Sequence, residues 1–244
     1  MIFDKKIYWL NVVDSTNNEA EKHIATSPEG SVWSAYSQTK GRGQRSNKWE
    51  SEPGKNLTFS ILLRPVFLKA ENQFLLAKVI SLGITDFLNE KGLQSCIKWP
   101  NDIYVGDKKI AGILIVNHLS GEYLTATVAG IGLNINQLIF TSNAPNPTSF
   151  FIETKQGLEL KSSLKQLLHA IEKRYIFLKE EKTAILENDY LARLYRFNEW
   201  HDYLQQDRKI RARIVGIRNT GELILEKDSG EVFFAAFKEI SFCL

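Results

Sequence analysis

Short runs of alternating or continuous apolar residues, rich in β-branched and aromatic side chains, recur through the first half of the chain and predict strands. The predicted strands cover residues 7–13, 32–38, 56–63, 96–99, 103–105, 110–116 and 124–134. Polar turns at Gly106-Asp107 and Ser120-Gly121 join the last three of these strands. We therefore expect an antiparallel meander in this part of the chain.

Apolar positions at helical spacing predict helices in three other stretches. The first begins near Thr16, because Glu19 follows it at the spacing of a capping box. The other two cover residues 74–88 and 160–194, the latter with a break near residues 182–183. Strands and helices do not alternate strictly, so the pattern predicts an α+β protein in which helices cover a mixed sheet.

The pattern changes after Trp200, where only short β-rich runs and turns remain. Three strands are predicted, at residues 209–217, 222–226 and 231–237. Gly-containing turns at residues 219–221 and 228–230 separate them, which is typical of a small barrel-like module. We place the domain boundary near residue 195, with a larger domain at 1–195 and a small β-barrel at 196–244.

Composition narrows the class of protein only slightly. A chain of 244 residues with 43% apolar residues is long enough for one medium domain and a small one. The net charge of +3 is too small to argue for nucleic-acid binding by itself. Cys96 and Cys243 have no metal-ligand or disulfide-framework spacing. With neither a membrane-spanning run nor a signal peptide in the sequence, we expect a cytoplasmic protein.

Several common chemistries are excluded by their missing motifs. The sequence contains neither a P-loop nor a Gly-x-Ser-x-Gly elbow. Gly130-Ile131-Gly132 lacks the third glycine and the acidic partner of a dinucleotide-binding fingerprint. The four histidines are far apart, so the sequence offers no metal-ligand set. Any phosphate chemistry must therefore use a different kind of site.

The segment from Gly41 to Trp49 combines glycines, cations and an aromatic ring. Glycine allows backbone conformations that other residues resist, and guanidinium groups bind phosphate and carboxylate through charge-assisted hydrogen bonds. Arg42, Arg45 and Lys48 supply the cations. The segment is compatible with an exposed basic loop and with a loop that covers a bound anion.

Other polar residues lie beside predicted strands, and each allows a structural and a functional interpretation. Lys98 is a lysine at a strand end or the partner of a buried anion. Small residues at 111–112 suggest that a bulky group approaches that face of the sheet. Asn134 either caps a turn or contacts the polar edge of a ring. Gln38 ends an apolar strand, where a buried amide needs a hydrogen-bond partner.

Five of these segments, taken in order, resemble the biotin–protein ligases. They are Asp14-Ser15-Thr16-Asn17, Gln38 with Gly41-Arg42-Gly43-x-Arg45-x-x-x-Trp49, Lys98-Trp99-Pro100-Asn101-Asp102, Lys109-x-Ala111-Gly112-Ile113 and Gly130-x-Gly132-x-Asn134. Each motif alone is weak, but the ordered set is specific and covers roughly residues 7 to 140.

The resemblance implies an enzyme that uses ATP, with Mg²⁺, to activate biotin as biotinoyl-5′-AMP. The biotin is then transferred to one lysine of a biotin carboxyl carrier protein or domain, such as that of acetyl-CoA carboxylase. The implied fold is a mixed-sheet catalytic domain followed by a small C-terminal SH3-like β-barrel.

The resemblance also implies a role for each matching residue. The catalytic residues would be Arg42 and Lys98. The biotin-binding residues would be Ser15, Thr16, Asn17, Gln38, Gly41, Arg42, Gly43, Gln44, Lys98 and Gly112. The nucleotide-binding residues would be Arg45, Trp49, Lys109 and Asn134, with Trp49 stacking near the adenine. No residue is expected to bind a metal directly.

Two departures from the family's commonest loop are Gln44, where many members have arginine, and Ser46, where many have glycine. Bifunctional members carry an N-terminal DNA-binding module, and the first predicted strand begins too early in this chain to leave room for one. We therefore expect no sequence-specific DNA binding. A lipoate or octanoate ligase of the same fold, a non-enzymatic binding module, a homodimer and a role for Asp102 as proton acceptor all remain open.

Overall fold

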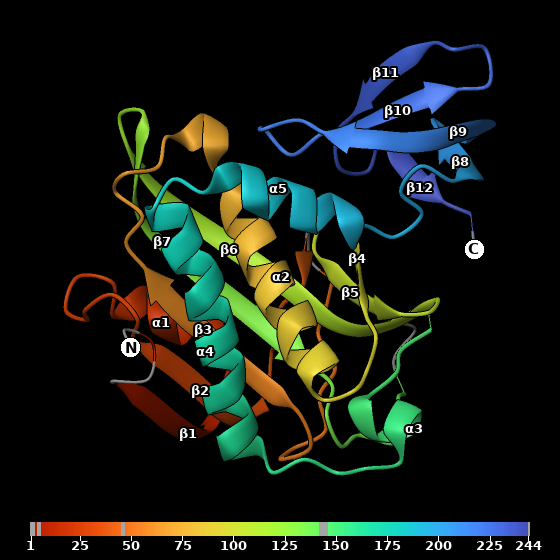
Figure 1. The fold of residues 1–244 in the computed structure, drawn as a ribbon. Coiled ribbons are helices and arrows are strands. Elements are labelled where there is room, and N and C mark those ends of the chain that lie inside the picture. The colour runs from red at the N-terminus through yellow and green to blue at the C-terminus, as the bar shows by residue number, and fades with distance from the viewer. Residues whose placement is uncertain (1–2, 4–5, 45–46, 142–145, 244) are drawn as a thin grey trace.

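A seven-stranded mixed sheet forms the centre of the larger part of the protein (Figure 1). The computed structural model describes residues 3, 6–44, 47–141 and 146–243. The strands are β1 (Ile7–Val13), β2 (Val32–Gln38), β3 (Leu57–Leu63), β4 (Cys96–Lys98), β5 (Asp102–Val105), β6 (Lys108–Ser120) and β7 (Tyr123–Leu133). Their spatial order is β1-β2-β3-β7-β6-β5-β4. Only β1 and β2 pair in parallel among these neighbours, so the sheet is mixed, as the sequence predicted.

The antiparallel meander β5–β6–β7 is confirmed. Strand β6 extends beyond both of its predicted ends, and β7 is shifted by one residue toward the N-terminus. In the β6–β7 ladder, Gly112 lies opposite Gly132 and Leu114 lies opposite Gly130. Successive side chains of a strand point to opposite faces. These four residues therefore share one face of the sheet, and their neighbours Ile113 and Ile131 face the helical core on the other side.

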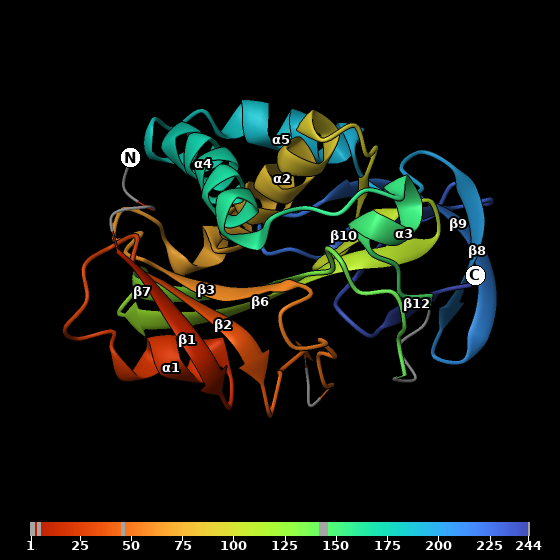
Figure 2. The same ribbon diagram turned by 90° about the horizontal axis from the view of Figure 1, so that it is seen from below.

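Helices cover both faces of the sheet unequally, as Figure 2 shows. The helices are α1 (Thr16–Lys22), α2 (Phe74–Glu90), α3 (Phe150–Thr154), α4 (Leu160–Lys179) and α5 (Thr183–Ala192), with a 3₁₀ turn at Ala70–Asn72. The layer of α2, α4 and α5 packs on one face, and α1 packs on the other. The predicted break in the long C-terminal helical stretch is confirmed between α4 and α5.

Close backbone approach and a charged cluster hold α2 against α4 and α5. A Cβ atom on Gly83 would lie 2.6 Å from the Cα of Ile171, so only glycine allows α2 and α4 this separation. The Asp86 carboxylate accepts hydrogen bonds from Arg174 of α4 and from Arg193 after α5. Burial opposes ionisation of Asp86, but these two guanidinium groups outweigh it and hold the pKa of the carboxyl below its ordinary value.

The predicted capping box at Thr16 and Glu19 is wrong. The N-cap of α1 is Ser15, and its side chain makes no capping hydrogen bond. The Thr16 N–H instead donates to Oε1 of Gln38 at 2.7 Å, and Glu19 pairs with Lys22. The amide at the end of β2 therefore satisfies the first turn of α1, which also supplies the partner that a buried amide at Gln38 required.

The C-terminal part is a second, five-stranded antiparallel sheet, seen at the upper right of Figure 1. Its strands are β8 (Trp200–Gln205), β9 (Arg208–Ile217), β10 (Leu223–Lys227), β11 (Val232–Ala235) and β12 (Ile240–Phe242), in the order β11-β10-β9-β8-β12. The expected three strands correspond to β9, β10 and β11; β8 and β12 were missed. Polar residues interrupt the apolar pattern of β8, and β12 has only three residues. The division at residues 1–195 and 196–244 stays a prediction.

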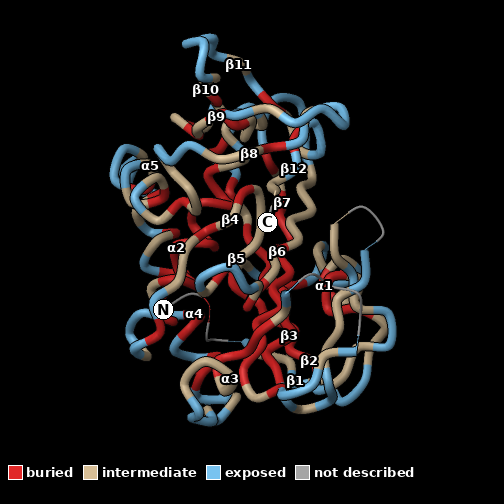
Figure 3. Tube along the Cα trace, turned by 90° about the vertical axis from the view of Figure 1, so that its right-hand side faces the viewer, coloured by how far each residue is buried: buried red, intermediate tan, exposed pale blue. Residues whose placement is uncertain are grey.

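Buried residues concentrate along the central strands and under α2 (Figure 3). All seven residues of β3 are buried. The same apolar cluster continues into the second sheet through Tyr203, Ile214 and Leu225. This second sheet, which we call the barrel from here on, is therefore packed onto the larger sheet and its helices. No helix in the described ranges is long and apolar enough to cross a membrane.

Candidate active site

A cavity of about 510 Å³ opens on the face of the sheet that carries the strand glycines. It is bounded by the start of α1, the loop before Trp49, the turn after β4 and the end of the barrel. The expected site residues that line it are Ser15, Thr16, Asn17, Gln38, Arg42, Gly43, Gln44, Trp49, Lys98, Lys109 and Gly112. Gly41 and Asn134 are not among its lining residues. Arg45 and Ser46 lie outside the described residues.

Hydrogen bonds between buried polar side chains organise one end of the cavity. Ser15, Thr16 and Asn17 are all almost fully buried. The Ser60 hydroxyl donates to Oδ1 of Asn17 at 2.6 Å and lies 2.8 Å from Oγ1 of Thr16. Asn17 also donates through Nδ2 to the Leu114 carbonyl. We call Thr16, Asn17, Gln38 and Ser60 the polar cradle.

Ser60 is a residue that the sequence analysis missed. It lies on β3, where the run Leu57–Leu63 is otherwise largely apolar and completely buried. A hydroxyl in such a strand requires a partner, because an unsatisfied buried polar group is costly. That requirement was the available signal, and the structure shows that its partners are the side chains of α1.

The glycines of β6 and β7 make room for side chains that lie flat on the sheet. A Cβ atom on Gly132 would overlap the indole of Trp49, and one on Gly130 would overlap the amide of Asn17. A Cβ atom on Gly112 would lie 3.0 Å from the same indole. The bulky group expected to approach residues 111–112 is therefore the ring of Trp49. Its buried Nε1 has no hydrogen-bond partner among the described residues.

The loop before Trp49 folds back on itself. The Trp49 N–H donates to the Gly41 carbonyl at 3.0 Å, and the Gly43 N–H donates to the Asn47 carbonyl at 2.7 Å. A Cβ atom on Gly41 would lie 2.5 Å from the Trp49 carbonyl oxygen, so this glycine permits the close pairing. Nη1 of Arg42 donates to Oδ1 of Asn18 at 2.7 Å, which holds the guanidinium beside α1 at the cavity.

Lys98 reaches the cavity from the end of β4, between two aromatic rings. Its Nζ donates to the Tyr104 hydroxyl at 2.9 Å. The same atom lies 4.6 Å from the centroid of the Tyr104 ring and 5.0 Å from that of Phe242. Burial lowers the pKa of Lys98, and the nearby charge of Asp102 only partly opposes this effect.

The turn after β4 is held by Asn101. Its Nδ2 donates to the Ile113 carbonyl at 2.7 Å, and the Ile113 N–H donates to the Asn101 carbonyl at 2.9 Å. Asp102 contacts Nζ of Lys109 at 2.6 Å, and that Nζ lies 5.9 Å from the centroid of the Trp49 ring. The carboxylate thus positions a lysine beside the indole, and Asn101 holds the turn.

Asn134 lies behind the cavity, where it is buried. Its Nδ2 donates to the Thr148 carbonyl at 2.9 Å. Its Oδ1 has no hydrogen-bond partner in the part of the chain that the structure describes. Contact between Asn134 and a ring edge stays a prediction. Within the same described ranges, no group of three or more His, Cys, Asp or Glu side chains is placed to hold a metal ion.

The family model described as the Biotin/lipoate A/B protein ligase family matches residues 9–134, more than half of the chain. The chain belongs to this family. A biotin–[acetyl-CoA-carboxylase] ligase of Paracoccus denitrificans is 31% identical over 91% of this chain and 97% of that protein. The bifunctional ligase/repressor BirA of Bacillus spizizenii is 29% identical over 71% of this chain. The match spans about half, 55%, of the length of that relative.

Solved structures agree with this family membership. The biotin protein ligase from Aquifex aeolicus, in complex with biotin and ATP, superposes with a TM-score of 0.80. It is 28% identical in sequence, and the match covers 98% of this chain and 99% of that chain. The expected fold of this family, a mixed-sheet domain with helices followed by a small antiparallel sheet, is confirmed.

Proposed function

We propose that the protein is a biotin–protein ligase. In this proposal it joins biotin to ATP as biotinoyl-5′-AMP and then transfers the biotinoyl group to a lysine of a biotin carboxyl carrier protein or domain. The observation that carries the proposal is the combination, in one cavity, of Thr16, Asn17 and Gln38 of the polar cradle with the cations of Arg42, Lys98 and Lys109. Ser60 supports Thr16 and Asn17 by hydrogen bonds. Such a cavity suits a molecule with a polar head at one end and anionic groups at the other.

The polar cradle fits the ureido ring of biotin, which has two N–H donors and one carbonyl acceptor. Asn17 and Gln38 bring amide groups to the cradle, and Thr16 and Ser60 bring hydroxyl groups. Donors and acceptors buried in this way favour a ring that can hydrogen-bond over one that cannot. This chemistry favours biotin over lipoate, whose ring carries sulfur atoms in place of the ureido group. Ser15, Gly41, Gly43, Gln44 and Gly112 belong to the proposed biotin site by the resemblance.

In the first step, a carboxylate oxygen of biotin attacks the α-phosphorus of ATP. An O–P bond forms, the bond from the α-phosphorus to the oxygen that bridges to the β-phosphate breaks, and pyrophosphate leaves. The carboxylate is ionised at neutral pH and requires no general base. Its difficulty is repulsion by the phosphates, and we assign Arg42 and Lys98 to neutralise both partners and the developing charge.

The nucleotide would lie beside Trp49 and Lys109. The indole offers a flat face for the adenine, and Asp102 holds the Lys109 ammonium beside that indole. Arg45 and Asn134 belong to this proposed nucleotide site by the resemblance. Mg²⁺ would enter with ATP and screen the phosphates. Asp102 is the carboxylate among the cavity's lining residues and is engaged by Lys109, so we assign no protein side chain to the ion.

In the second step, the neutral amine of the carrier lysine attacks the acyl carbon of biotinoyl-5′-AMP. An N–C bond forms, the C–O bond to the phosphate breaks, AMP leaves, and the proton lost by the amine passes to water. The ion pair with Lys109 occupies Asp102, and we therefore assign it to positioning Lys109 and not to accepting the proton. The cationic side chains around the cavity would assist the departure of AMP by stabilising its charge.

The test is incubation of the protein with ATP, Mg²⁺, biotin and a carboxylase carrier domain. We expect mass spectrometry to show one biotinoyl group on one lysine of the carrier. The Lys98→Ala variant should lose most of this activity. If the wild type forms no adduct, or if Lys98→Ala equals the wild type, the assignment is wrong.

The alternative of a lipoate or octanoate ligase is separated by calorimetry. We expect heat of binding with biotin and none with lipoate at the same concentration.

A gel shift with operator-like DNA tests the prediction that the protein does not bind a specific DNA sequence. The cytoplasmic location stays a prediction, and a homodimer stays an open alternative.

A further inference from the structure

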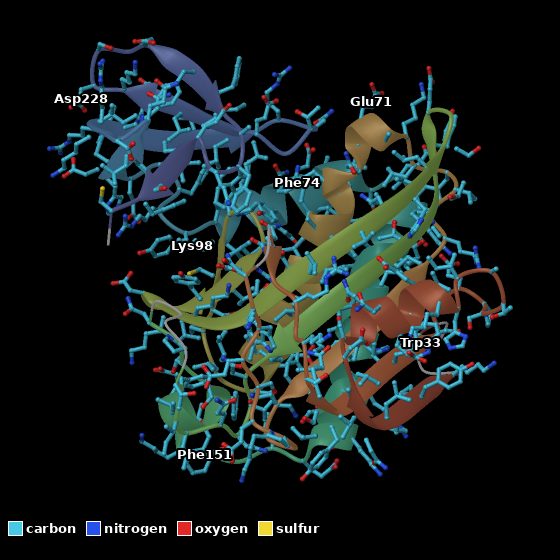
Figure 4. The ribbon with its side chains drawn as sticks, turned by 180° about the vertical axis from the view of Figure 1, so that it is seen from behind. Trp33, Glu71, Phe74, Lys98, Phe151 and Asp228 are labelled. Carbon is cyan, nitrogen blue, oxygen red and sulfur yellow. The ribbon has the colours of Figure 1, made fainter. Side chains whose placement is uncertain are left out.

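The barrel supplies one wall of the proposed active site. Phe237, Lys238 and the β12 strand line the cavity together with the residues of the larger sheet. Figure 4 shows Lys98 on the side of the sheet that faces the barrel, with Asp228 at the barrel's outer end. A part of the chain more than 130 residues distant in sequence therefore borders the lysine assigned to the adenylation step.

Phe242 is the barrel residue in contact with Lys98. The Lys98 ammonium lies 5.0 Å from the centroid of the Phe242 ring, within the range of a cation–π interaction. Tyr104 binds the same ammonium through its hydroxyl and its ring. The barrel holds Phe242 in turn, because Tyr203 of β8 packs edge-on against it at 5.3 Å. Tyr195, which precedes the barrel, lies 6.1 Å from the same ring.

The neighbouring residue, Trp99, ties the same turn to the barrel at a second point. Its Nε1–H donates to the Gly221 carbonyl at 2.7 Å, and its ring packs edge-on against Phe237 at 6.0 Å. Lys98 and Trp99 therefore both contact the barrel. This arrangement fixes the turn relative to Phe242 and determines where the Lys98 side chain meets its aromatic partners.

We propose that Phe242 is a positioning residue that holds the Lys98 ammonium where the biotin carboxylate meets the α-phosphate. This inference rests on the proposed function. A lysine side chain has a flexible four-carbon stem, so its charge requires an external constraint to stay in one place. The Phe242 ring attracts the cation from one side and gives it no hydrogen bond, which leaves the remaining ammonium protons for the anionic substrates.

The experiment is a double-mutant cycle in the full chain between Phe242→Leu and Lys98→Met, with formation of biotinoyl-5′-AMP as the readout. In the wild-type background, Phe242→Leu should lower kcat for adenylation about tenfold, as loss of a desolvated cation–π contact implies. The dissociation constant for biotin should change less than about twofold, because the polar cradle is untouched. In the Lys98→Met background, Phe242→Leu should have no further effect on kcat.

The matched control is Phe234→Leu. Phe234 is also a barrel residue, and its ring lies 4.8 Å from the guanidinium of Arg218, away from the cavity lining. This change should leave kcat unaltered in both backgrounds. Pentafluorophenylalanine at position 242 keeps the shape of the ring and reverses its electrostatic face, so it should lower kcat even if Phe242→Leu fails to fold.

Three outcomes would overturn the inference. They are an unchanged kcat in Phe242→Leu, equal losses with and without Lys98, and an unchanged kcat with the fluorinated ring. Failure of the proposed function is distinguishable, because the wild type would then form no biotinoyl-5′-AMP at all.

Discussion

The Lys98 ammonium is a site cation that is partly withdrawn from water. It is enclosed by Tyr104 and Phe242, and burial lowers its pKa. A lysine is charged below its pKa, so a lowered pKa means that the charge is lost at a lower pH than in an ordinary lysine. If this charge supports adenylation, the adenylation rate should fall at alkaline pH, as Lys98 loses its proton.

Replacement of Lys98 by arginine tests this expectation, because a guanidinium stays charged throughout the accessible pH range. We expect Lys98→Arg to form biotinoyl-5′-AMP about tenfold more slowly at neutral pH, since a longer, planar guanidinium places its donors differently from the ammonium. The alkaline limb of its rate profile should move to higher pH. Lys227→Arg in the barrel is the control. If the rate falls at the same alkaline pH in the wild type and in Lys98→Arg, a group other than Lys98 causes that fall.

Ser60 organises the proposed biotin cradle by contacting both Thr16 and Asn17. Its replacement by alanine removes this partner from Oγ1 of Thr16 and Oδ1 of Asn17, and the loss of one such buried hydrogen bond is worth about 1 kcal/mol. We therefore expect Ser60→Ala to weaken biotin binding about fivefold to tenfold by calorimetry. Ser81→Ala removes an equally buried hydroxyl of α2, outside the cavity lining, and should leave the affinity unchanged. Equal effects of the two changes would contradict a specific role for Ser60.

At the scale of elements, the paired strands β6 and β7 act as a platform. Alternation places Gly112, Gly130 and Gly132 on one face of the ladder, where Trp49 and Asn17 lie against the backbone. The opposite face carries the isoleucines that pack under the helices. The same two strands thus build the core and leave a flat surface for the site.

Alanine at Gly132 should displace Trp49, because the added Cβ atom would overlap the indole. If the indole supports the nucleotide, the KM for ATP should rise at least about tenfold, whereas biotin affinity should change little. Gly112→Ala is a graded comparison, since its Cβ atom would lie 3.0 Å from the ring and requires only a small shift. Equal KM values for ATP in the two variants and the wild type would show that Trp49 does not support nucleotide binding.

At the scale of the whole molecule, the contact between the barrel and the helical layer links the barrel to the proposed active site. Gly221 has a positive φ of 99°, its carbonyl accepts the hydrogen bond from Nε1–H of Trp99, and it packs against Phe74 at the start of α2. Figure 4 shows Phe74 on the barrel side of that helix. One turn of the barrel therefore touches both the helical layer and Trp99, which directly follows Lys98.

A matched pair of glycine substitutions tests this contact. In Gly221→Ala the new Cβ atom would lie 2.7 Å from Phe74, whereas Gly230, also at positive φ, has open space around it. Both changes add the backbone strain of about 1 kcal/mol, and only Gly221→Ala adds the clash. We expect a larger loss of thermal stability and of adenylation rate in Gly221→Ala. Equal losses in the two variants would show that the contact with Phe74 does not matter.

Local periodicity and motifs were sufficient to predict much of this protein. The α+β class, the meander and the break between α4 and α5 follow from patterns within short segments. The resemblance to a known family, and not periodicity, supplied the expected site residues, of which eleven line the cavity. Periodicity reports which face of an element is buried, so it identifies elements without knowing their neighbours. It failed for β8 and β12, whose sequences are polar or very short.

Only the tertiary structure decided which side chains act on one another across the chain. The cap of α1 comes from Gln38, the partner of Asn17 is Ser60, the ring on the strand glycines is Trp49, and Phe242 borders Lys98. Each contact joins residues that are distant in sequence, and no local pattern specifies which of many compatible partners will meet. The sequence by itself determined the elements and the chemistry available to them; packing of the sheet, helices and barrel determined where that chemistry is assembled.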